Sequence, residues 1–168
     1  MIASPASSVT DAPTTVVERS LSSCLELMFP AARRDLLQHP WNGTPGTVSR
    51  PAAQAAALNF APARWLLLDA DAAVVADAVA AGAVAIDVEG KWRCFDVRGA
   101  QAASLLSSGV NVAAVLEARD CAAVSLFDCP AVITRRSSGD GFEVYVSASY
   151  AVSLRAALET ALQRSARS

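Results

Sequence analysis

The amino-acid sequence predicts an α+β fold in which a mostly antiparallel sheet carries helices on one face. The first observation is a repeated unit. An apolar strand pattern ends, two or three residues follow and a helical pattern begins, after Leu68, Val97 and Val146. The second is that tight turns such as Glu89-Gly90 join other strands directly. This mixture is typical of α+β proteins, because a doubly wound parallel sheet requires more helical crossovers.

The N-terminal third is predicted to lie outside the globular body. Residues 1–17 are rich in Ser, Thr, Pro and Ala without periodicity, which predicts a disordered tail. Residues 18–57 are predicted to hold a helix, over 20–28, and a connector rich in proline and glycine. If this head segment orders on assembly, its apolar residues are the expected anchors: Leu21, Leu25 and Met28. Residues 58–168 then form the α+β domain.

The elements of that domain follow from local patterns. A strand at 65–68 leads into a helix that ends near Ala81, with Asp69 or Asp71 as its cap. Strands over 83–88 and 91–97 are expected to form a hairpin closed at Glu89-Gly90. A helix from Gly99 to Ser108 should place three residues inward, and strands follow at 122–126 and 131–135. The inward residues are Ala102, Leu105 and Leu106.

The last unit has the clearest pattern. Phe142, Val144 and Val146 alternate with polar neighbours, as in a half-buried strand, after a turn at 139–141. The helix that begins near Ser149 carries apolar residues at helical spacing, which predicts that it lies on the sheet. Its predicted buried face consists of Tyr150, Leu154, Ala157, Leu158, Ala161 and Leu162.

Composition and charge exclude several classes of protein. The formal net charge is −2, so there is no basic footprint for nucleic acid. The longest stretch without a charge, residues 99–116, contains Gln101, Asn111 and three serines, which does not match a membrane span. The N-terminus has no positively charged start and no apolar run, so we do not expect a secretory signal. We expect a soluble cytoplasmic protein without a nucleic-acid or membrane partner.

The sequence shows no recognisable arrangement of catalytic residues. Four irregularly spaced cysteines, at 24, 94, 121 and 129, are interpreted as small core residues. The single histidine, His39, lies in the predicted connector and is interpreted as a surface residue. Arg119-Asp120 is interpreted as a solvated pair, with an ion pair or a partner contact as the alternative. We therefore predict no catalytic, no cofactor-binding and no metal-ligating residue in this chain.

Four segments, in their order and spacing, resemble a known family over roughly residues 58–165. They are Pro62–Leu68, Asp87–Gly90 with Phe95–Gly109, Cys121–Ile133, and Phe142–Val146 with Ser149–Leu154. The set resembles the gamma subunit of heterotetrameric sarcosine oxidase. More distantly, it is similar to the aminomethyltransferase family, the glycine-cleavage T-protein.

The resemblance implies a T-protein-like fold with ferredoxin-like elements and no active site in this chain. It implies larger flavoprotein subunits as partners, which together bind FAD, FMN, NAD and tetrahydrofolate. Such a complex demethylates sarcosine, or a related N-methyl amine, oxidatively and passes the one-carbon unit to folate. The gamma chain would then serve assembly.

Two alternatives stay open. A stand-alone folate or one-carbon binding domain of the T-protein type needs an acidic residue for the pterin ring, and the only candidates are Glu89, Asp96 and Asp128. A generic α+β interaction domain needs none of these residues.

Overall fold

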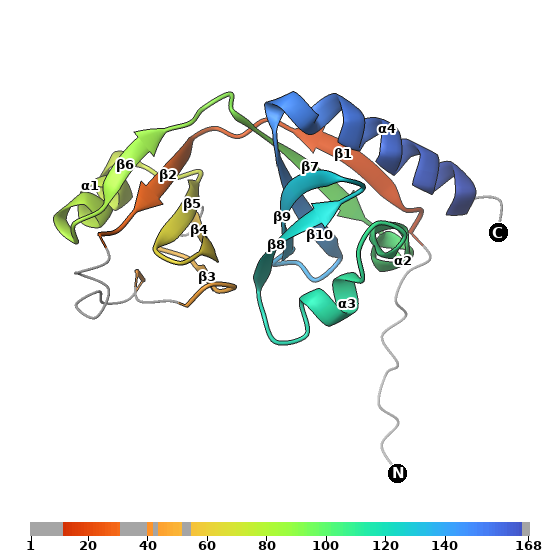
Figure 1. Ribbon diagram of the computed structural model, residues 1–168, viewed down its shortest axis with the longest axis horizontal. Coiled ribbons are helices and arrows are strands. Elements are labelled where there is room, and N and C mark those ends of the chain that lie inside the picture. The colour runs from red at the N-terminus through yellow and green to blue at the C-terminus, as the bar shows by residue number, and fades with distance from the viewer. Residues whose placement is uncertain (1–11, 31–39, 42–43, 52–54, 166–168) are drawn as a thin grey trace, which may run out of the picture.

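The computed structural model describes residues 12–30, 40–41, 44–51 and 55–165 (Figure 1). It confirms the α+β class and the antiparallel pairing, although the strands form two sheets. In chain order the strands are β1 (Thr15–Arg19), β2 (Cys24–Met28), β3 (Val48–Ser49), β4 (Ala56–Ala61), β5 (Arg64–Leu68), β6 (Val84–Asp87), β7 (Trp92–Arg98), β8 (Cys121–Leu126), β9 (Cys129–Arg135) and β10 (Gly141–Ser147). The helices are α1 (Ala72–Ala80), α2 (Ala102–Ser107), α3 (Val112–Val115) and α4 (Ala148–Ser165).

The elements stack in four layers. Sheet A has the strand order β1-β7-β10-β9-β8, and sheet B has the order β3-β4-β5-β2-β6. Figure 1 shows α1 on the outer side of sheet B, and α2, α3 and α4 on the outer side of sheet A. The two sheets face each other in the middle. The central strands of each sheet are therefore covered on both faces, which differs from the single sheet with one covered face that the sequence predicts.

Three apolar clusters fill the spaces between these layers. Between sheet A and its helices, Phe95, Val97 and Val144 pack against residues such as Leu106 and Leu154. Between the sheets, four residues of sheet B or its flank meet four of sheet A; they are Cys24, Leu58, Leu66 and Leu68, with Cys94, Cys121, Val132 and Tyr145. Between sheet B and α1, the cluster includes Trp65, Leu67, Val74 and Ala78 together with Phe29 and Trp41. Each fully buried leucine contributes roughly 2 kcal/mol to folding.

The predicted helix over 20–28 is wrong. Cys24–Met28 forms strand β2, which lies between β5 and β6 in sheet B. Cys24 packs toward sheet A while Leu25 and Leu27 pack toward α1, so both faces of the strand are buried. A strand with two buried faces lacks the apolar–polar alternation that identifies a strand in the sequence, and its apolar residues happen to match helical spacing.

The predicted disordered tail extends too far. Thr15–Arg19 forms the edge strand β1, which pairs antiparallel with β7 from Thr15–Arg98 to Arg19–Cys94. Residues 12–30 thus contribute one strand to each sheet, and the boundary expected between residues 57 and 58 falls inside β4. Residues 1–11, including most of the predicted tail, lie outside the described residues, as does His39.

The predicted hairpin over 83–97 is also wrong, although both of its strands and its turn are present. The amide of Lys91 donates to the carbonyl of Val88 (2.9 Å), which closes the turn. β6, however, pairs with β2 in sheet B, whereas β7 pairs with β1 and β10 in sheet A. β7 aligns with β10 over seven positions, a longer ladder than the four residues of β6 offer.

The helices follow their predictions closely. Asp71 caps α1 by accepting a hydrogen bond from the amide of Val74 (3.0 Å). The three inward residues of α2 are buried as expected. In α4 the buried stripe is Ala151, Leu154, Leu158 and Ala161, with Ala157 and Leu162 partly buried, and the inward placement of Tyr150 is wrong. Tyr150 lies in the first turn of α4, before the first buried residue of that stripe, and is 42% exposed.

Helix α3 falls in a stretch for which no element was expected. None of the helices in the described residues is long and apolar enough to cross a membrane.

Candidate functional site

All four cysteines are buried and free of disulfides, which confirms that they are core residues. Burial raises the pKa of Cys24, Cys94 and Cys121 from 9.0 to about 12, and it also raises the pKa of Cys129. A nucleophilic thiol requires the opposite shift, because the thiolate is the reactive form. These cysteines therefore stabilise the core and do not react at neutral pH.

The most unusual feature of the structure is a cluster of charged side chains on the face of sheet A that looks toward sheet B. Here we call it the ion-pair cluster; it consists of Arg19, Arg98 and Arg136 with Asp69, Asp96, Asp140 and Glu143. Asp96 lies on β7 directly opposite Glu143 on β10. It is 3% exposed, which is exceptional for a carboxylate.

Asp96 is the centre of the cluster. Its carboxylate lies 2.6 Å from the guanidinium of Arg98, 2.8 Å from that of Arg136 and 3.7 Å from that of Arg19. A buried carboxylate is tolerated only when its charge and its hydrogen-bonding capacity are matched in this way. Through Asp96, the cluster thus links β7 to β1 and to the residue that follows β9.

Arg19 connects the two sheets. Its guanidinium lies 3.2 Å from Glu143 on β10 and 3.5 Å from Asp69, which follows β5 in sheet B. Asp69 also accepts hydrogen bonds from the amide and hydroxyl of Ser22 (3.1 and 2.6 Å). Asp69 therefore fixes the crossing from β1 to β2, while Asp71 is the helix cap.

Tyr145 completes the buried polar region. Its hydroxyl donates to Glu143 (2.9 Å). Burial, reinforced by nearby acidic groups, holds the pKa of Tyr145 well above its ordinary value. The hydroxyl therefore remains a hydrogen-bond donor at every physiological pH.

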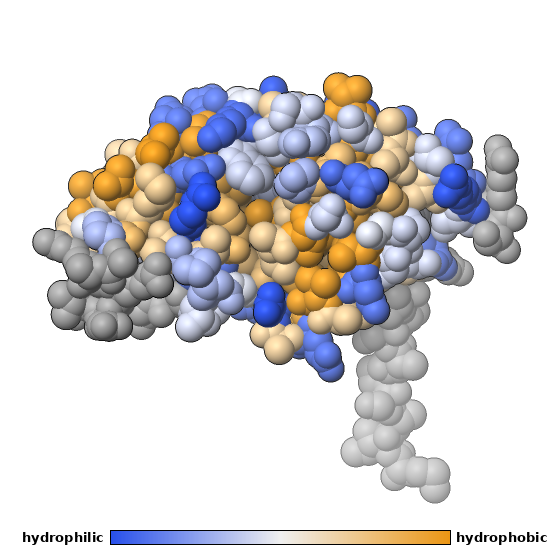
Figure 2. All heavy atoms as spheres, viewed as in Figure 1, coloured by the Kyte–Doolittle hydropathy of each residue, from blue (hydrophilic) through white to orange (hydrophobic). Residues whose placement is uncertain are grey.

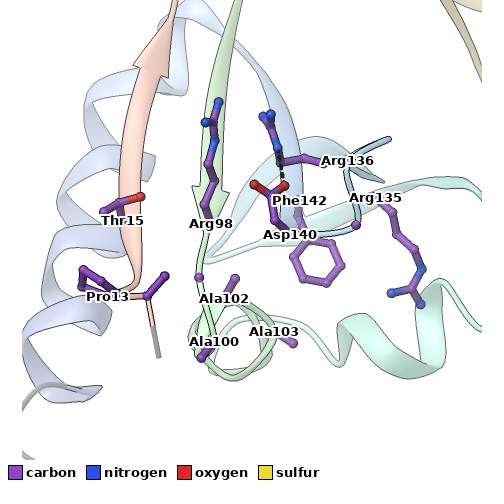
Figure 3. A pocket seen from close by; sticks show the side chains of 14 residues that line it. Pro13, Thr15, Arg98, Ala100, Ala102, Ala103, Arg135, Arg136, Asp140 and Phe142 are labelled. Carbon is purple, nitrogen blue, oxygen red and sulfur yellow. Dashed lines mark hydrogen bonds and ion pairs between the residues drawn. The ribbon is translucent and has the colours of Figure 1, made fainter. Parts of the chain in front are cut away.

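A hollow of about 650 Å³ lies at one end of sheet A, beside the ion-pair cluster (Figure 3). This volume falls within the range of small-molecule sites. Its walls combine several alanines and Phe142 with the side chains of Arg98, Arg135 and Arg136. Figure 3 shows that Arg98 and Arg136 extend in one direction and Arg135 in another.

The three arginines of the hollow are already engaged. Arg98 and Arg136 pair with Asp96, and Arg136 also pairs with Asp140 (2.9 Å). Arg135 donates to the carbonyl of Leu116 (3.3 Å) and lies over the ring of Phe142. Their charges do not converge on one point, so the hollow offers no evident anion site.

Of the three carboxylates considered for a pterin ring, a single one in a pocket would suffice. Asp96 is buried and ion-paired with arginines of the ion-pair cluster, while Glu89 and Asp128 are exposed in two different turns. None of the three lines the 650 Å³ hollow. Within the described residues, no group of three or more His, Cys, Asp and Glu side chains is arranged to hold a metal ion.

Asp120 is used inside the chain. Its carboxylate accepts from the amide of Val48 (3.4 Å), and the amides of Asp120 and Cys121 both donate to the carbonyl of Gly46 (2.8 and 3.0 Å). Arg119 and Asp120 are both exposed, as the solvated-pair interpretation predicts, and Asp120 also helps to join the start of β8 to sheet B.

Sequence reasoning missed the ion-pair cluster, although a signal was present. Asp96 and Arg98 alternate with Phe95 and Val97, and Glu143 alternates with Phe142 and Val144. Alternation of this kind places charges on the face opposite the apolar side chains. That face was expected to meet water, and only the second sheet makes it an interior.

The remaining candidate surface is apolar. Six large hydrophobic side chains in the described residues are exposed: Val17, Val79, Val84, Ile86, Tyr150 and Val152. Val84 and Ile86 lie on one face of the edge strand β6, and Figure 2 shows hydrophobic side chains at the surface over β6 and α1.

Comparison with known proteins identifies a solved structure with a similar fold. No family model and no curated protein matches the sequence. Among solved structures, the chain is similar to one from the heterotetrameric sarcosine oxidase of Corynebacterium sp. U-96, which was solved in complex with pyrrole 2-carboxylate. The match has a TM-score of 0.70 and 19% sequence identity, and it covers 90% of this chain and 84% of the other. The chain therefore has the fold of a sarcosine oxidase chain over nearly its whole length.

Proposed function

We propose that this chain is a non-catalytic, gamma-type subunit of a flavin-dependent, folate-linked sarcosine oxidase complex. The observation that carries the proposal is the shared fold over 90% of the chain. The solved structure that shares this fold belongs to a heterotetrameric sarcosine oxidase. The four resembling segments support the same subunit type. The complex would demethylate sarcosine or a related N-methyl amine oxidatively, in the cytoplasm, and feed one-carbon metabolism.

The internal chemistry of the chain supports a role in assembly. The arginines and carboxylates that crowd sheet A are matched to one another across β1, β7 and β10. The buried thiols are held in their protonated form. FAD, FMN, NAD and tetrahydrofolate would accordingly be held by the partner subunits, and the contribution of this chain would be to bind and position them.

The test is isolation of the full-length, tagged chain from its native host under mild conditions. The proposal predicts a yellow complex with a flavin spectrum, in which mass spectrometry identifies a large FAD-binding chain. Addition of sarcosine should then drive oxygen uptake by the complex. A colourless preparation without a flavoprotein partner would contradict the proposal.

The stand-alone folate domain makes a different prediction. Titration of the isolated chain with tetrahydrofolate would produce heat and a change in tryptophan fluorescence. None of Glu89, Asp96 and Asp128 lines the 650 Å³ hollow, so this alternative has no specific support from the described residues.

A further inference from the structure

The free edge of sheet B is formed by β6, which lacks the features that usually protect an edge strand from pairing. β6 pairs with β2 on one side, and no other strand of the described residues pairs with its opposite side. Native edge strands are commonly blunted by lysine, proline or a bulge, because an open edge invites pairing with another chain. β6 reads Val-Ala-Ile-Asp, with only Asp87 charged and no proline.

The register identifies the backbone groups that point outward. The amide of Val88 donates to the carbonyl of Cys24 (3.0 Å), so these two residues form a hydrogen-bonded pair. In an antiparallel ladder such pairs alternate, so Ile86 and Val84 also bond to β2. The N–H and C=O groups of Ala85 and Asp87 therefore face away from the sheet.

The side chains of β6 reinforce this open edge. Val84 is 54% exposed and Ile86 is 41% exposed, on the face opposite α1. Asp87 and Glu89, both exposed, stand at the end of the strand. The edge thus combines two outward backbone pairs, an apolar face and an acidic end.

We propose that β6 is a docking edge for an extended strand of the partner flavoprotein subunit, an inference that rests on the proposed function. The outward groups of Ala85 and Asp87 require the hydrogen-bonding pattern of a β-strand. The incoming strand is apolar at alternate positions, against Val84 and Ile86, and basic beside Asp87 and Glu89. Strand addition of this kind extends sheet B by one strand.

Charge favours this occupant over a second copy of the chain. Symmetric pairing of two β6 strands would bring Asp87 of both copies into one short, four-residue ladder, where like charges repel. A partner strand with basic side chains beside Asp87 and Glu89 would instead be attracted to this edge.

The first test uses Ala85→Pro in the full-length chain, expressed in the native host. Proline removes the outward N–H of residue 85 and leaves the bonds to β2 intact, which is where edge strands tolerate it. The variant should keep its far-ultraviolet circular dichroism and thermal midpoint. Its capture of the flavoprotein chain, quantified by mass spectrometry and flavin absorbance, should fall by about tenfold or more.

A pair of lysine substitutions supplies the matched control. Ile86→Lys places a charge on the proposed contact, whereas Val152→Lys places the same charge on α4 at a side chain that is 78% exposed. Ile86→Lys should lose the flavoprotein and Val152→Lys should retain it. Amide hydrogen exchange at Ala85 and Asp87 should slow by about tenfold in the wild-type complex relative to the free chain.

Each other outcome overturns the inference in its own way. If the wild-type chain and all three variants capture the flavoprotein equally, β6 is not the docking edge, and the proposed function stands. If the free wild-type chain is a dimer that Ala85→Pro dissociates, the occupant is a second copy. If the wild-type chain captures no flavoprotein, both the proposed function and this inference fail.

Discussion

The guanidinium of Arg136 lies 2.8 Å from the carboxylate of Asp96, whose side chain is 4% exposed, in the space between two sheets. Arg136 follows β9 and Asp96 lies on β7, so the pair spans β10, the strand between them. The same carboxylate pairs with Arg98 and Arg19. One buried anion thus pairs with three cations from different parts of sheet A.

Replacement of that anion should be among the most damaging changes in the chain. Asp96→Asn keeps the shape of the side chain and removes the buried charge with which all three arginines pair. We expect a loss of about 3 kcal/mol in the free energy of unfolding, measured by urea denaturation. Asp128→Asn, at an exposed turn, is the control and should change stability by about 0.5 kcal/mol or less. Equal effects of the two substitutions would show that the cluster contributes little.

The close approach of the N-terminal segment to sheet A can be tested at Gly99. Its φ is +102°, and an added Cβ would lie 2.8 Å from the carbonyl oxygen of Pro13 and 2.8 Å from the Cα of Thr14. Gly139 also has a positive φ (+75°), but nothing lies within 4 Å of its added Cβ. Gly139→Ala should therefore cost about 1 kcal/mol from backbone strain alone, and Gly99→Ala at least twice that.

Thermal unfolding of the two alanine variants measures the difference. Similar midpoints for Gly99→Ala and Gly139→Ala would mean that residues 13 and 14 do not pack against Gly99. The placement of β1 beside β7 would then have to be revised.

Stability should decline in alkaline solution as the buried thiols ionise. The pKa values of Cys24, Cys94 and Cys121 are about 12 in the folded chain, against 9.0 for an unperturbed thiol. Below pH 9 the thiols are protonated in both states, so they add no pH dependence. Between about pH 9 and 12 the unfolded state releases these protons first, and the free energy of unfolding falls. Urea midpoints at pH 7.5 and pH 10 test this sign, because a higher midpoint at pH 10 would contradict it.

The same burial predicts slow thiol chemistry. A thiol reagent at pH 8 should modify the native chain only as fast as it opens, and should label all four cysteines rapidly in denaturant. Fast labelling of a single cysteine in the native chain would identify a reactive thiol that the structure does not contain.

The aromatic cluster beneath α1 gives one further prediction. The indole N–H of Trp41 donates to the carboxylate of Asp77 on α1 (3.0 Å), and the Trp41 ring meets that of Trp65 at 87° with centroids 6.1 Å apart. Asp77→Ala leaves this buried donor without its partner and should cost about 1–2 kcal/mol. Glu89→Ala, at an exposed position in the turn after β6, is the control and should leave stability nearly unchanged.

From Trp65 onward, the sequence predicts the elements well because their signals are local. The cap at Asp71, the turn at 139–141 and the stripe of α4 each depend on residues close together in the chain. The division of the strands between two sheets is not local. β6 and β7 are separated by one tight turn, yet β6 pairs with β2 in sheet B, and β7 pairs with β1 and β10 in sheet A. Which sheet each strand joins is decided by competition among pairings that are distant in the sequence.

The candidate surfaces show the same limit. The charges of Asp96 and Glu143 and the apolar face of β6 are visible in the sequence, but their meaning depends on neighbours. Because sheet B covers them, Asp96 and Glu143 become part of the ion-pair cluster between the sheets. Because no strand of the described residues pairs with the far side of β6, its apolar face stands at an open edge.

The most direct test of the subunit assignment is native mass spectrometry of the tagged chain purified from its own host. The account predicts a single large assembly in which this 17.4 kDa chain is present in one-to-one ratio with a flavin-bearing chain. When the assembly is activated in the gas phase, this chain should dissociate from it as an intact subunit. A spectrum in which the chain runs alone, as a 17.4 kDa monomer without flavin-bearing partners, would contradict the account.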